Sequence, residues 1–397
     1  MREEQHLRTD ILCTLGVLCR QIDRSNQYLE QALRCRRMML TAYYAHETGL
    51  KLMHVMKYAD ASADFRHDNS MPLNRAAEIA ADLMADVMRF RRVAGHQGSC
   101  VTLPCSACLA PHLTKVISAI TQGNPITFVL PAFPGKSPNP EKVLGPLPDM
   151  AERRALEFLD HLCDRVQRHH LPGARVILCS DGRVFSDAVG MREEDVTAYQ
   201  HEISRMIEEL HLTSVSTFNL DDLYEGLDFS QMRRELMERY GKPLNILKDM
   251  IRQGGKPYSS LENEEAHRMY CGITRFLVED ATRFGQTQSR TAVQKECRNR
   301  AHEVIQRSNA WSELIANQFP EAVRLSIHPQ SCGAKKIGIR LVGAESWMTP
   351  WHSVAVDLGG RFILLKRSQA EALGAQIVYS AGRPSHYHLT ETQCLAG

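Results

Sequence analysis

The 397-residue sequence contains no apolar run of the roughly 18 residues that a membrane-spanning helix needs. The apolar stretch at residues 11–19 follows two glutamates and lacks a small-residue cleavage site, so it is not typical of a secretory signal. The 48 lysines and arginines oppose 46 aspartates and glutamates, and the resulting formal charge of +2 provides no field that would attract nucleic acid. We therefore expect a cytoplasmic protein that binds neither nucleic acid nor a membrane.

The signatures of several common enzyme classes are also absent. No Gly-x-Gly-x-x-Gly follows a predicted strand, and neither Gly-x-Ser-x-Gly nor His-Glu-x-x-His occurs. These absences argue against the common dinucleotide-binding, hydrolase and metalloprotease types. Hydrophobic residues nevertheless make up 43% of the chain, which is enough for a sizeable core. Any function must therefore be sought in less common motifs.

The 12 cysteines do not indicate a disulfide framework, because a chain of this length needs no such bonds to be stable. We expect mostly buried thiols in a reducing compartment. Cys100, Cys105, Cys108 and His112 form the sharpest metal-like cluster, with spacings that a zinc site could use. The same residues could form a redox-active Cys-x-x-Cys or be ordinary, partly buried side chains. The sequence favours ordinary side chains, and we assign no metal.

Strands and helices alternate from about residue 98. Residues 125–130, 176–179, 214–218 and 323–327 are short apolar runs that predict strands, and helices are expected from about residues 149 and 195. Residues 229–318 are mainly helical, and the remainder returns to strands, with a hairpin at 358–361. We predict an α/β fold with a Rossmann-like, mainly parallel sheet, flanking helices, a helical insertion and a partly antiparallel C-terminal portion. Residues 1–74 are predicted to be a helical N-terminal extension, and residues 75–385 the main α/β domain.

Polar residues follow several of the predicted strands directly. Carboxyl ends of parallel strands lie at one edge of an α/β sheet, and ligands bind in the crevice at that edge. If these strands are parallel neighbours, the residues that follow them contribute to one site. Those residues include Phe133, Lys136, Ser137, Asp181, Arg183, Asp187 and His328.

Each of these residues also has a structural interpretation. Lys136 and Ser137 can bind an anion, or they can belong to a rigid, proline-rich loop. Asp181 precedes a glycine, so it is either a turn former or a carboxylate whose pKa burial raises into the range of a general base. Arg183 can bind phosphate or carboxylate with its guanidinium, or it can pair with Asp187 at the surface.

Similar alternatives exist closer to the C-terminus. His328 follows a strand at the same edge and is a candidate for acid–base chemistry, although a single histidine is more often a hydrogen-bonded core residue. Lys335 and Lys336 are consecutive, so at most one of them points into a site if a strand begins there. The segment 347–352 holds two of the three tryptophans. It forms either a hydrophobic plug capped by His352 or an aromatic wall for a flat substrate.

Several of these stretches resemble the isocyanide (isonitrile) synthase family, also called the pyoverdine/dityrosine biosynthesis family. The most specific stretch is the run Leu-Pro-Ala-Phe-Pro-Gly-Lys-Ser-Pro-Asn-Pro at residues 130–140. Similar stretches also occur at residues 142–145, 148–152, 179–187, 324–329 and 347–352. The resemblance covers about residues 75–380 and leaves the N-terminal extension outside it.

The resemblance implies an enzyme of secondary metabolism that condenses the α-amine of an aromatic L-amino acid with ribulose 5-phosphate. Tyrosine is the favoured amino acid and tryptophan the next. The carbonyl carbon of the sugar becomes the isocyanide carbon, and no organic cofactor is needed because the ketone itself serves as the electron sink. An iron/2-oxoglutarate-dependent oxygenase of the same pathway is the expected next enzyme.

This interpretation gives the candidate residues defined roles. Proton transfer is expected from Asp181, His328 and Asp187. Cationic side chains are needed for the phosphate, and apolar walls are needed for the aromatic ring. The expected substrate-binding residues are Lys136, Ser137, Arg183, Lys335, Arg340, Phe133, Trp351 and His352.

Two other classes of function stay open. The chain could be another phosphosugar-dependent or acyl-transfer enzyme, which would show phosphate-dependent turnover without an isocyanide product. It could also be a non-catalytic, ligand-binding relative. That second class would be favoured if Asp181 and His328 lay too far apart to meet one substrate.

Overall fold

A computed structural model of the chain describes residues 72–94, 100, 104–282, 287–343 and 348–389. Nearly all of the predicted N-terminal extension (1–74) lies outside the described residues, so the predicted domain boundaries stay predictions. Within the described residues, no helix is long and apolar enough to cross a membrane.

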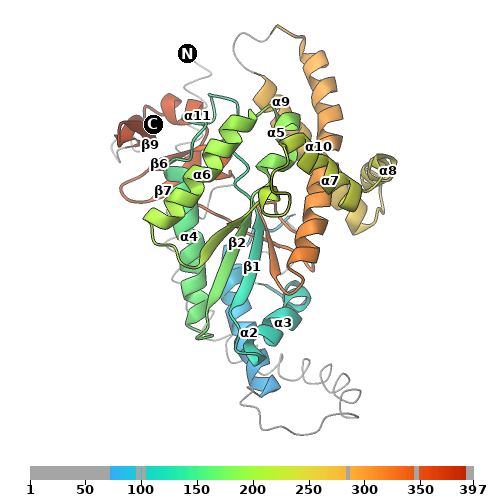
Figure 1. Cartoon of the computed structure of the whole chain (residues 1–397), viewed down its shortest axis with the longest axis vertical. Coiled ribbons are helices and arrows are strands. Elements are labelled where there is room, and N and C mark those ends of the chain that lie inside the picture. Colours follow the sequence, from blue (N-terminus) through green and yellow to red (C-terminus); the bar gives the residue numbers. More distant parts are fainter. Residues whose placement is uncertain (1–71, 95–99, 101–103, 283–286, 344–347, 390–397) are drawn as a thin grey trace.

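The centre of the fold is a five-stranded sheet in which every pair of neighbouring strands is parallel (Figure 1). Its spatial order is β3-β2-β1-β4-β5, so the chain builds one side of the sheet first and then crosses over to build the other. The strands are β1 (Ile126–Pro131), β2 (Ala174–Cys179), β3 (Val215–Phe218), β4 (Val323–Ser326) and β5 (Ile337–Gly338). The predicted Rossmann-like, parallel sheet is confirmed, although its edge strand β5 is only two residues long.

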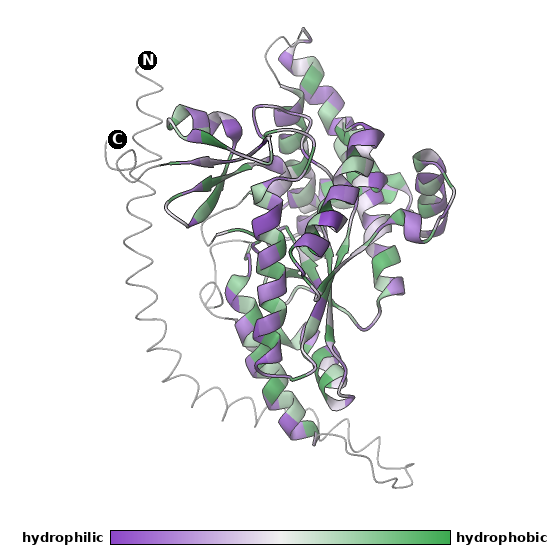
Figure 2. Ribbon diagram, turned by 60° about the vertical axis from the view of Figure 1, so that its left-hand side comes forward, coloured by the Kyte–Doolittle hydropathy of each residue, from purple (hydrophilic) through white to green (hydrophobic). Residues whose placement is uncertain are grey.

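Helices cover both faces of this sheet. Alternate side chains of β1 point to opposite faces: Phe128 and Leu130 pack under one layer of helices, and Val129 packs under the other. The first layer consists of α2 (Leu73–Val87), α3 (Ser106–Thr121), α4 (Met150–Gln167) and α6 (Glu193–Glu209), and the second includes α7 (Phe229–Tyr240) and α10 (Arg290–Gln318). Helices around the sheet carry alternating hydrophobic and hydrophilic stretches (Figure 2). Burial on both faces explains why the strands are continuous apolar runs in the sequence.

Helix α4 begins where the sequence predicts it. The Ala151 amide donates to Asp149 Oδ1 at 2.8 Å, and the Asp149 amide donates to Glu152 Oε2 at 3.0 Å, which is a reciprocal capping box. The helix then runs from the carboxyl edge of the sheet to the amino edge, where β2 starts. Its N-terminus therefore lies at the edge where ligands bind in folds of this type.

The predicted helical insertion is also confirmed. Between β3 and β4 the chain forms the 3₁₀ turn η2 (Leu220–Asp222), α7, α8 (Leu244–Gly254), α9 (Leu261–Ala281) and α10. The insertion packs against α5 (Gly182–Val189), which directly follows β2. The sequence analysis treated the start of α5 only as a turn. It missed this helix because Asp-Gly is more typical of turns than of helix starts.

A smaller, four-stranded sheet follows, in the order β7-β6-β9-β8. Its strands are β6 (Val354–Asp357), β7 (Phe362–Leu365), β8 (Gln376–Ser380) and β9 (Arg383–His388), with α11 (Arg367–Ala372) between β7 and β8. The predicted hairpin joins β6 and β7, and Gly359 and Gly360 adopt the positive φ angles of 72° and 94° that such turns require. The sequence analysis missed β9, whose proline and two histidines are not typical of a strand.

Candidate active site

The strand order shows where a ligand-binding crevice is expected at the carboxyl edge of the larger sheet. The chain leaves β1 toward β2 on one side and reaches β4 on the other, and such a switch point opens a crevice between the two strand ends. Val129 of β1 pairs with Arg324 of β4, so continued register brings Pro131 beside Ser326. The prediction that these strands are parallel neighbours is confirmed. The segments that start at residues 132 and 327 therefore lie at this crevice.

His328 lies just beyond β4 at this position. Its side chain is accessible to solvent, yet desolvation by the surrounding protein, together with the charges of Arg92 and Lys336, lowers its pKa to about 4. Because its imidazole is neutral near pH 7, one ring nitrogen can accept a proton while the other donates a hydrogen bond.

His352 is a second neutral imidazole in the same region. It ends the 3₁₀ turn η3 (Pro350–His352), and burial lowers its pKa to about 4, with smaller opposing effects from Asp280 and Lys142. Its Nδ1 atom is buried and has no hydrogen-bond partner among the described residues. The charge of His352 contributes to the lowered pKa of His328, so the two rings lie within electrostatic range.

Arg92 and Lys336 lie near His328, and Arg340 lies near Arg92; we call these three cations the basic group. Burial, and then the charge of Arg340, lowers the pKa of Arg92 to about 10. Lys336 is half-buried, and burial followed by repulsion from Arg324 lowers its pKa to about 8. Mutual repulsion among buried cations is relieved when an anion binds. The basic group is therefore suited to a phosphate.

Only one of the two consecutive lysines takes part in this group. Lys335 is exposed, whereas Lys336 is half-buried beside His328. This agrees with the expectation that at most one of them points inward. The sequence analysis favoured Lys335, because alternation alone does not say which member of a pair faces inward.

His352 is also within electrostatic range of Asp280 and Lys142, which together with Ser137 form what we call the acidic pocket. The Ser137 hydroxyl donates to Asp280 Oδ1 at 2.9 Å, and Lys142 Nζ approaches the same oxygen at 2.5 Å. The second oxygen, Asp280 Oδ2, is buried and has no hydrogen-bond partner among the described residues. A buried carboxylate oxygen without a partner is costly, so this atom is suited to a hydrogen-bond donor from a ligand.

Sequence analysis overlooked several of these residues. Asp280 lies at the end of α9 in the helical insertion, where no motif points to a site. Lys142 falls within a family-like stretch, but a lone lysine is usually a solvated surface residue. Arg92 belongs to no motif that the sequence analysis used. Contacts between residues more than a hundred positions apart bring these side chains together, and no local pattern reports them.

Lys136 is fully buried, and its ammonium group already has three acceptors. Lys136 Nζ lies 2.8 Å from Asp149 Oδ2, 2.7 Å from Glu152 Oε2 and 3.1 Å from the carbonyl oxygen of Pro350. An ammonium has three N–H groups, so none is left for a substrate phosphate. The geometry favours a positioning role, in which Lys136 joins the loop after β1 to α4 and η3.

Asp181 is the N-cap residue of α5, directly after β2. Burial raises the pKa of its carboxyl group to about 7, and Oδ1 has no hydrogen-bond partner among the described residues. The loop after β1 is close by, since the hydroxyl of Ser180 donates to the carbonyl oxygen of Phe133 at 2.8 Å. A desolvated carboxyl group with a pKa near neutrality has the properties of a general base.

Arg183 and Asp187, both on α5, are engaged in other contacts. Arg183 Nε binds Asp221 Oδ1 at 2.5 Å, and its guanidinium stacks on the ring of Phe229 at 4.7 Å from the centroid. Asp187 binds Arg307 Nη1 at 2.7 Å. Although burial raises the pKa of Asp187, this arginine holds it below the ordinary value. We therefore keep neither the phosphate-binding role of Arg183 nor the general-base role of Asp187.

Phe133 and Trp351 pack against each other, with ring centroids 5.3 Å apart. Both side chains are almost completely buried in the main core. Phe133 has a φ of 59°, which is unusual for a residue with a side chain and marks a strained loop. The two aromatic rings thus support the loop after β1 rather than forming an open wall.

Arg340, the other predicted anion ligand, extends from just after β5 and donates from Nη2 to the carbonyl oxygen of Arg91 at 3.3 Å. This contact places Arg340 beside the segment that carries Arg92. The structure thus brings Ser137, His328, Arg340 and His352 of the predicted residues to one region.

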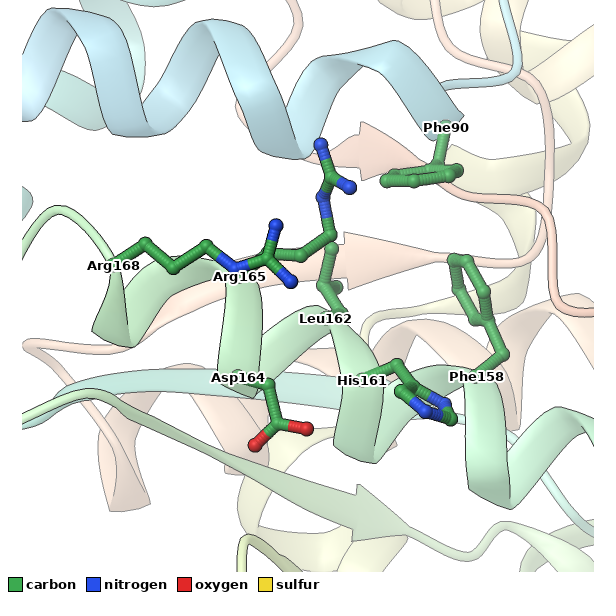
Figure 3. Close-up of a pocket in the computed structure, with 7 residues that line it drawn as sticks. All are labelled: Phe90, Phe158, His161, Leu162, Asp164, Arg165 and Arg168. Atoms are coloured by element: carbon green, nitrogen blue, oxygen red, sulfur yellow. The ribbon is translucent and has the colours of Figure 1, made fainter.

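One cavity lies beside these residues, and another lies away from them. The larger one, of about 410 Å³, is lined by residues 135–146 and 190–196, including Lys136 and Ser137 but not Asp181, Arg183 or His328. It shares Ser137 with the acidic pocket and is large enough for an amino acid. The smaller cavity, of about 240 Å³, lies on the C-terminal half of α4 between Phe90 and Phe158 (Figure 3). That half of α4 leads to the amino edge of the sheet, away from the crevice.

A doubly wound sheet with two histidines, a desolvated carboxyl group and several cations near its carboxyl edge has the architecture of an α/β enzyme. Residues 116–378 match the family model described as pyoverdine/dityrosine biosynthesis protein. The chain belongs to this family.

Individual relatives agree with this assignment. The chain is 44% identical over 320 residues to an L-tryptophan isonitrile synthase, AmbI2, of Fischerella ambigua, covering 80% of this chain and 94% of the relative. It is 45% identical over 283 residues to an L-tyrosine isonitrile synthase of Pseudomonas aeruginosa, covering 70% of this chain and 84% of the relative. The crystal structure of the PvcA protein from Pseudomonas aeruginosa superimposes with a TM-score of 0.73 at 41% identity, covering 78% of this chain and 99% of PvcA.

Proposed function

We propose that the chain is an isonitrile synthase that converts the α-amino group of tyrosine or tryptophan to an isonitrile, with ribulose 5-phosphate as the carbon donor. Isonitrile synthesis is the activity named in the relatives described above. The sugar phosphate is the donor that the family resemblance implies. The observation that carries the proposal is that His328 and His352 lie within electrostatic range of each other, with Arg92 and Lys336 near His328 and Asp280 near His352.

The basic group is the proposed site for the sugar phosphate. Lys336 has a lowered pKa because burial and a neighbouring cation destabilise its charged form. A phosphate dianion beside Lys336 and Arg92 would relieve this repulsion and form charge-assisted hydrogen bonds. The carbonyl group of the bound sugar would then extend toward His328, beside which both cations lie.

The acidic pocket is the proposed site for the amino group of the amino acid. Asp280 Oδ2 has no partner and can accept a hydrogen bond from the substrate ammonium. Imine formation requires a neutral amine, so a proton must leave before the amine attacks the sugar carbonyl. The Nδ1 atom of His352 is also without a partner and belongs to a neutral ring that can accept this proton.

Later steps need further proton transfers. Loss of water from the carbinolamine completes the imine, and removal of a proton next to the former carbonyl follows; these two steps require an acid and a base. His328 is placed at the carboxyl end of β4, and Asp181 is the carboxyl group whose pKa of about 7 suits the base. No organic cofactor enters this scheme, since the imine itself accepts the electrons.

We propose tyrosine as the favoured amino-acid substrate and tryptophan as the next candidate. We further propose that the enzyme acts in the cytoplasm and that its isonitrile product is the substrate of an iron/2-oxoglutarate-dependent oxygenase in the same pathway.

The test is to incubate the purified full chain with ribulose 5-phosphate and either amino acid, and to trap the isonitrile with a tetrazine. Sugar labelled with carbon-13 at its carbonyl carbon should give a labelled isonitrile. Ribulose without the phosphate is the matched control and should support little turnover. Consumption of the sugar phosphate without an isonitrile would indicate a different phosphosugar enzyme, and binding without turnover would indicate a ligand-binding relative. Either result would overturn the proposal.

A further inference from the structure

Four cysteines from distant parts of the chain meet at the start of α3. The Sγ atoms of Cys100, Cys105, Cys108 and Cys332 all lie within 4.8 Å of one another. Cys105 Sγ lies 3.7 Å from Cys108 Sγ and 3.4 Å from Cys332 Sγ, and the last two sulfurs are 3.5 Å apart. This four-cysteine cluster has no part in the acid–base chemistry proposed above.

The spacing of the sulfurs distinguishes two kinds of site. Sulfurs joined in a disulfide are roughly 2.05 Å apart, far closer than any pair here. Four thiolates around a tetrahedral zinc ion, each at about 2.3 Å, are separated from one another by roughly 3.8 Å. We propose that the four-cysteine cluster binds one structural Zn²⁺ ion.

The surroundings of the cluster are suited to thiolates. Cys105 lies at the N-terminus of α3, where the backbone N–H groups of Ala107 and Cys108 donate hydrogen bonds to its sulfur. The buried guanidinium of Arg91 lies within electrostatic range of three of the thiols, and its Nε has no hydrogen-bond partner among the described residues. A zinc ion with four thiolates carries a net charge of about −2, which this cation partly compensates.

The fourth ligand differs from the one that the sequence suggested. His112 lies on α3, one turn beyond Cys108, but it is buried elsewhere and does not belong to the cluster. Cys332 replaces it, although 224 positions separate it from Cys108. Because this fourth ligand comes from a distant loop, the ligands can surround the ion from more than one side, as a tetrahedral site requires.

A metal here would have a structural effect on the active site. Cys332 lies in the loop between β4 and β5, and the same loop carries His328 and Lys336. The loop is also attached to the segment before α3, because the amide of Gln330 donates to the carbonyl oxygen of Arg92 at 3.0 Å. Four protein ligands leave no open position for substrate, so the ion would hold the loop and take no part in the reaction.

The experiment measures metal in the purified full chain produced in zinc-supplemented medium. Elemental analysis should give about one zinc per chain. Cys332→Ser should lose most of this zinc, and Cys332→His, which restores a zinc ligand, should retain it. Cys271→Ser is the matched control, because Cys271 is exposed and outside the cluster. Replacement of zinc by cobalt should produce the strong thiolate-to-cobalt absorption and the visible bands of a tetrahedral site.

Two outcomes would overturn the proposal. One is a folded, zinc-supplemented parental protein that contains no stoichiometric metal. The other is a disulfide within the cluster, detected by mass spectrometry without reduction. If Cys332→Ser does not fold, the zinc content and the disulfide analysis of the parental protein still decide the question, together with the zinc content of Cys332→His. Iron in place of zinc would colour the protein red and would also contradict the assignment.

Discussion

The hydroxyl of Ser137 and the carboxylate of Asp280 share a hydrogen bond of 2.9 Å, although 143 positions separate the two residues. Ser137 belongs to the loop after β1, and Asp280 to the last turn of α9 in the helical insertion. The insertion therefore contributes directly to the candidate active site. Without it, the proposed amine site would lose its carboxylate.

Asp280→Asn should weaken amino-acid binding more than sugar-phosphate binding. The substitution keeps the shape of the side chain but replaces a charge-assisted hydrogen bond worth about 1.5–3 kcal/mol. KM for tyrosine or tryptophan should rise by roughly 10- to 100-fold, while KM for ribulose 5-phosphate changes little. Steady-state kinetics with each substrate varied in turn would measure both values. Asp249→Asn, on the exposed surface of α8, should match the parent.

Lys336→Gln and Lys335→Gln form a matched pair for the phosphate site. Lys336 is half-buried next to His328, and Lys335 is exposed. Loss of a charge-assisted contact should raise KM for ribulose 5-phosphate by roughly 10- to 100-fold in Lys336→Gln only. The measurement is turnover at varied sugar phosphate. Equal effects of the two substitutions would remove Lys336 from the basic group.

Asp181→Asn should stay folded and bind both substrates, but isonitrile formation should fall by at least about 100-fold. Asp187→Asn should keep most of the parental turnover, because Asp187 forms ion pairs elsewhere. If Asp181 is the base, kcat/KM of the parent should rise with pH through about 7, where its carboxyl group ionises. Near-parental turnover of Asp181→Asn would show that this residue only starts α5.

Asp181 should also make the stability of the folded protein depend on pH: stability should fall over the range in which activity rises. Asp181 ionises at a pKa of about 7 in the folded protein but at about 4 when unfolded, so the unfolded state binds fewer protons between these values. The parent should therefore lose stability as pH rises from about 4 to 7. Asp181→Asn should melt at a higher temperature than the parent at pH 8, and the difference should shrink toward pH 4. A constant difference across this range would contradict the raised pKa.

Lys136→Met should act mainly on folding. It leaves the carboxylates of Asp149 and Glu152 buried without their cation, and breaking such a pair costs about 3–5 kcal/mol. The melting temperature should fall clearly, and Glu152→Gln in the same background should recover part of the loss. If the melting temperature is unchanged and KM for the sugar phosphate rises instead, the anion-binding role predicted from the sequence is correct.

Features that depend on local chemistry were predictable from the sequence. The capping box at Asp149 and the hairpin at Gly359 require only neighbouring residues, and the apolar runs of β1 to β4 reflect burial on both faces of the sheet. Strand β9 was missed because Pro384 and its polar neighbours contradict strand propensity, whereas pairing with β6 and β8 overrides that propensity.

The site was predicted less completely. His328, His352 and Asp181 were identified from their positions next to apolar segments. Asp280 and Cys332 were not, because only the folded chain brings them to their partners. The charge of Lys136 suggested an anion site, but the sequence alone does not reveal that two carboxylates already surround it. Local patterns locate the edge of the sheet but not the long-range partners that decide the role of each charge.

Gly182 lies at the start of α5, where the loops after β1 and β2 meet. A Cβ atom at this position would lie 1.9 Å from the carbonyl oxygen of Pro134, which is backbone and cannot move aside cheaply. Even alanine would therefore push the two loops apart and separate Asp181 from the segment that carries Ser137. The absence of a side chain at Gly182 thus allows the loops after β1 and β2 to pack in direct contact, so no larger residue fits between the loop of Ser137 and the proposed base, Asp181.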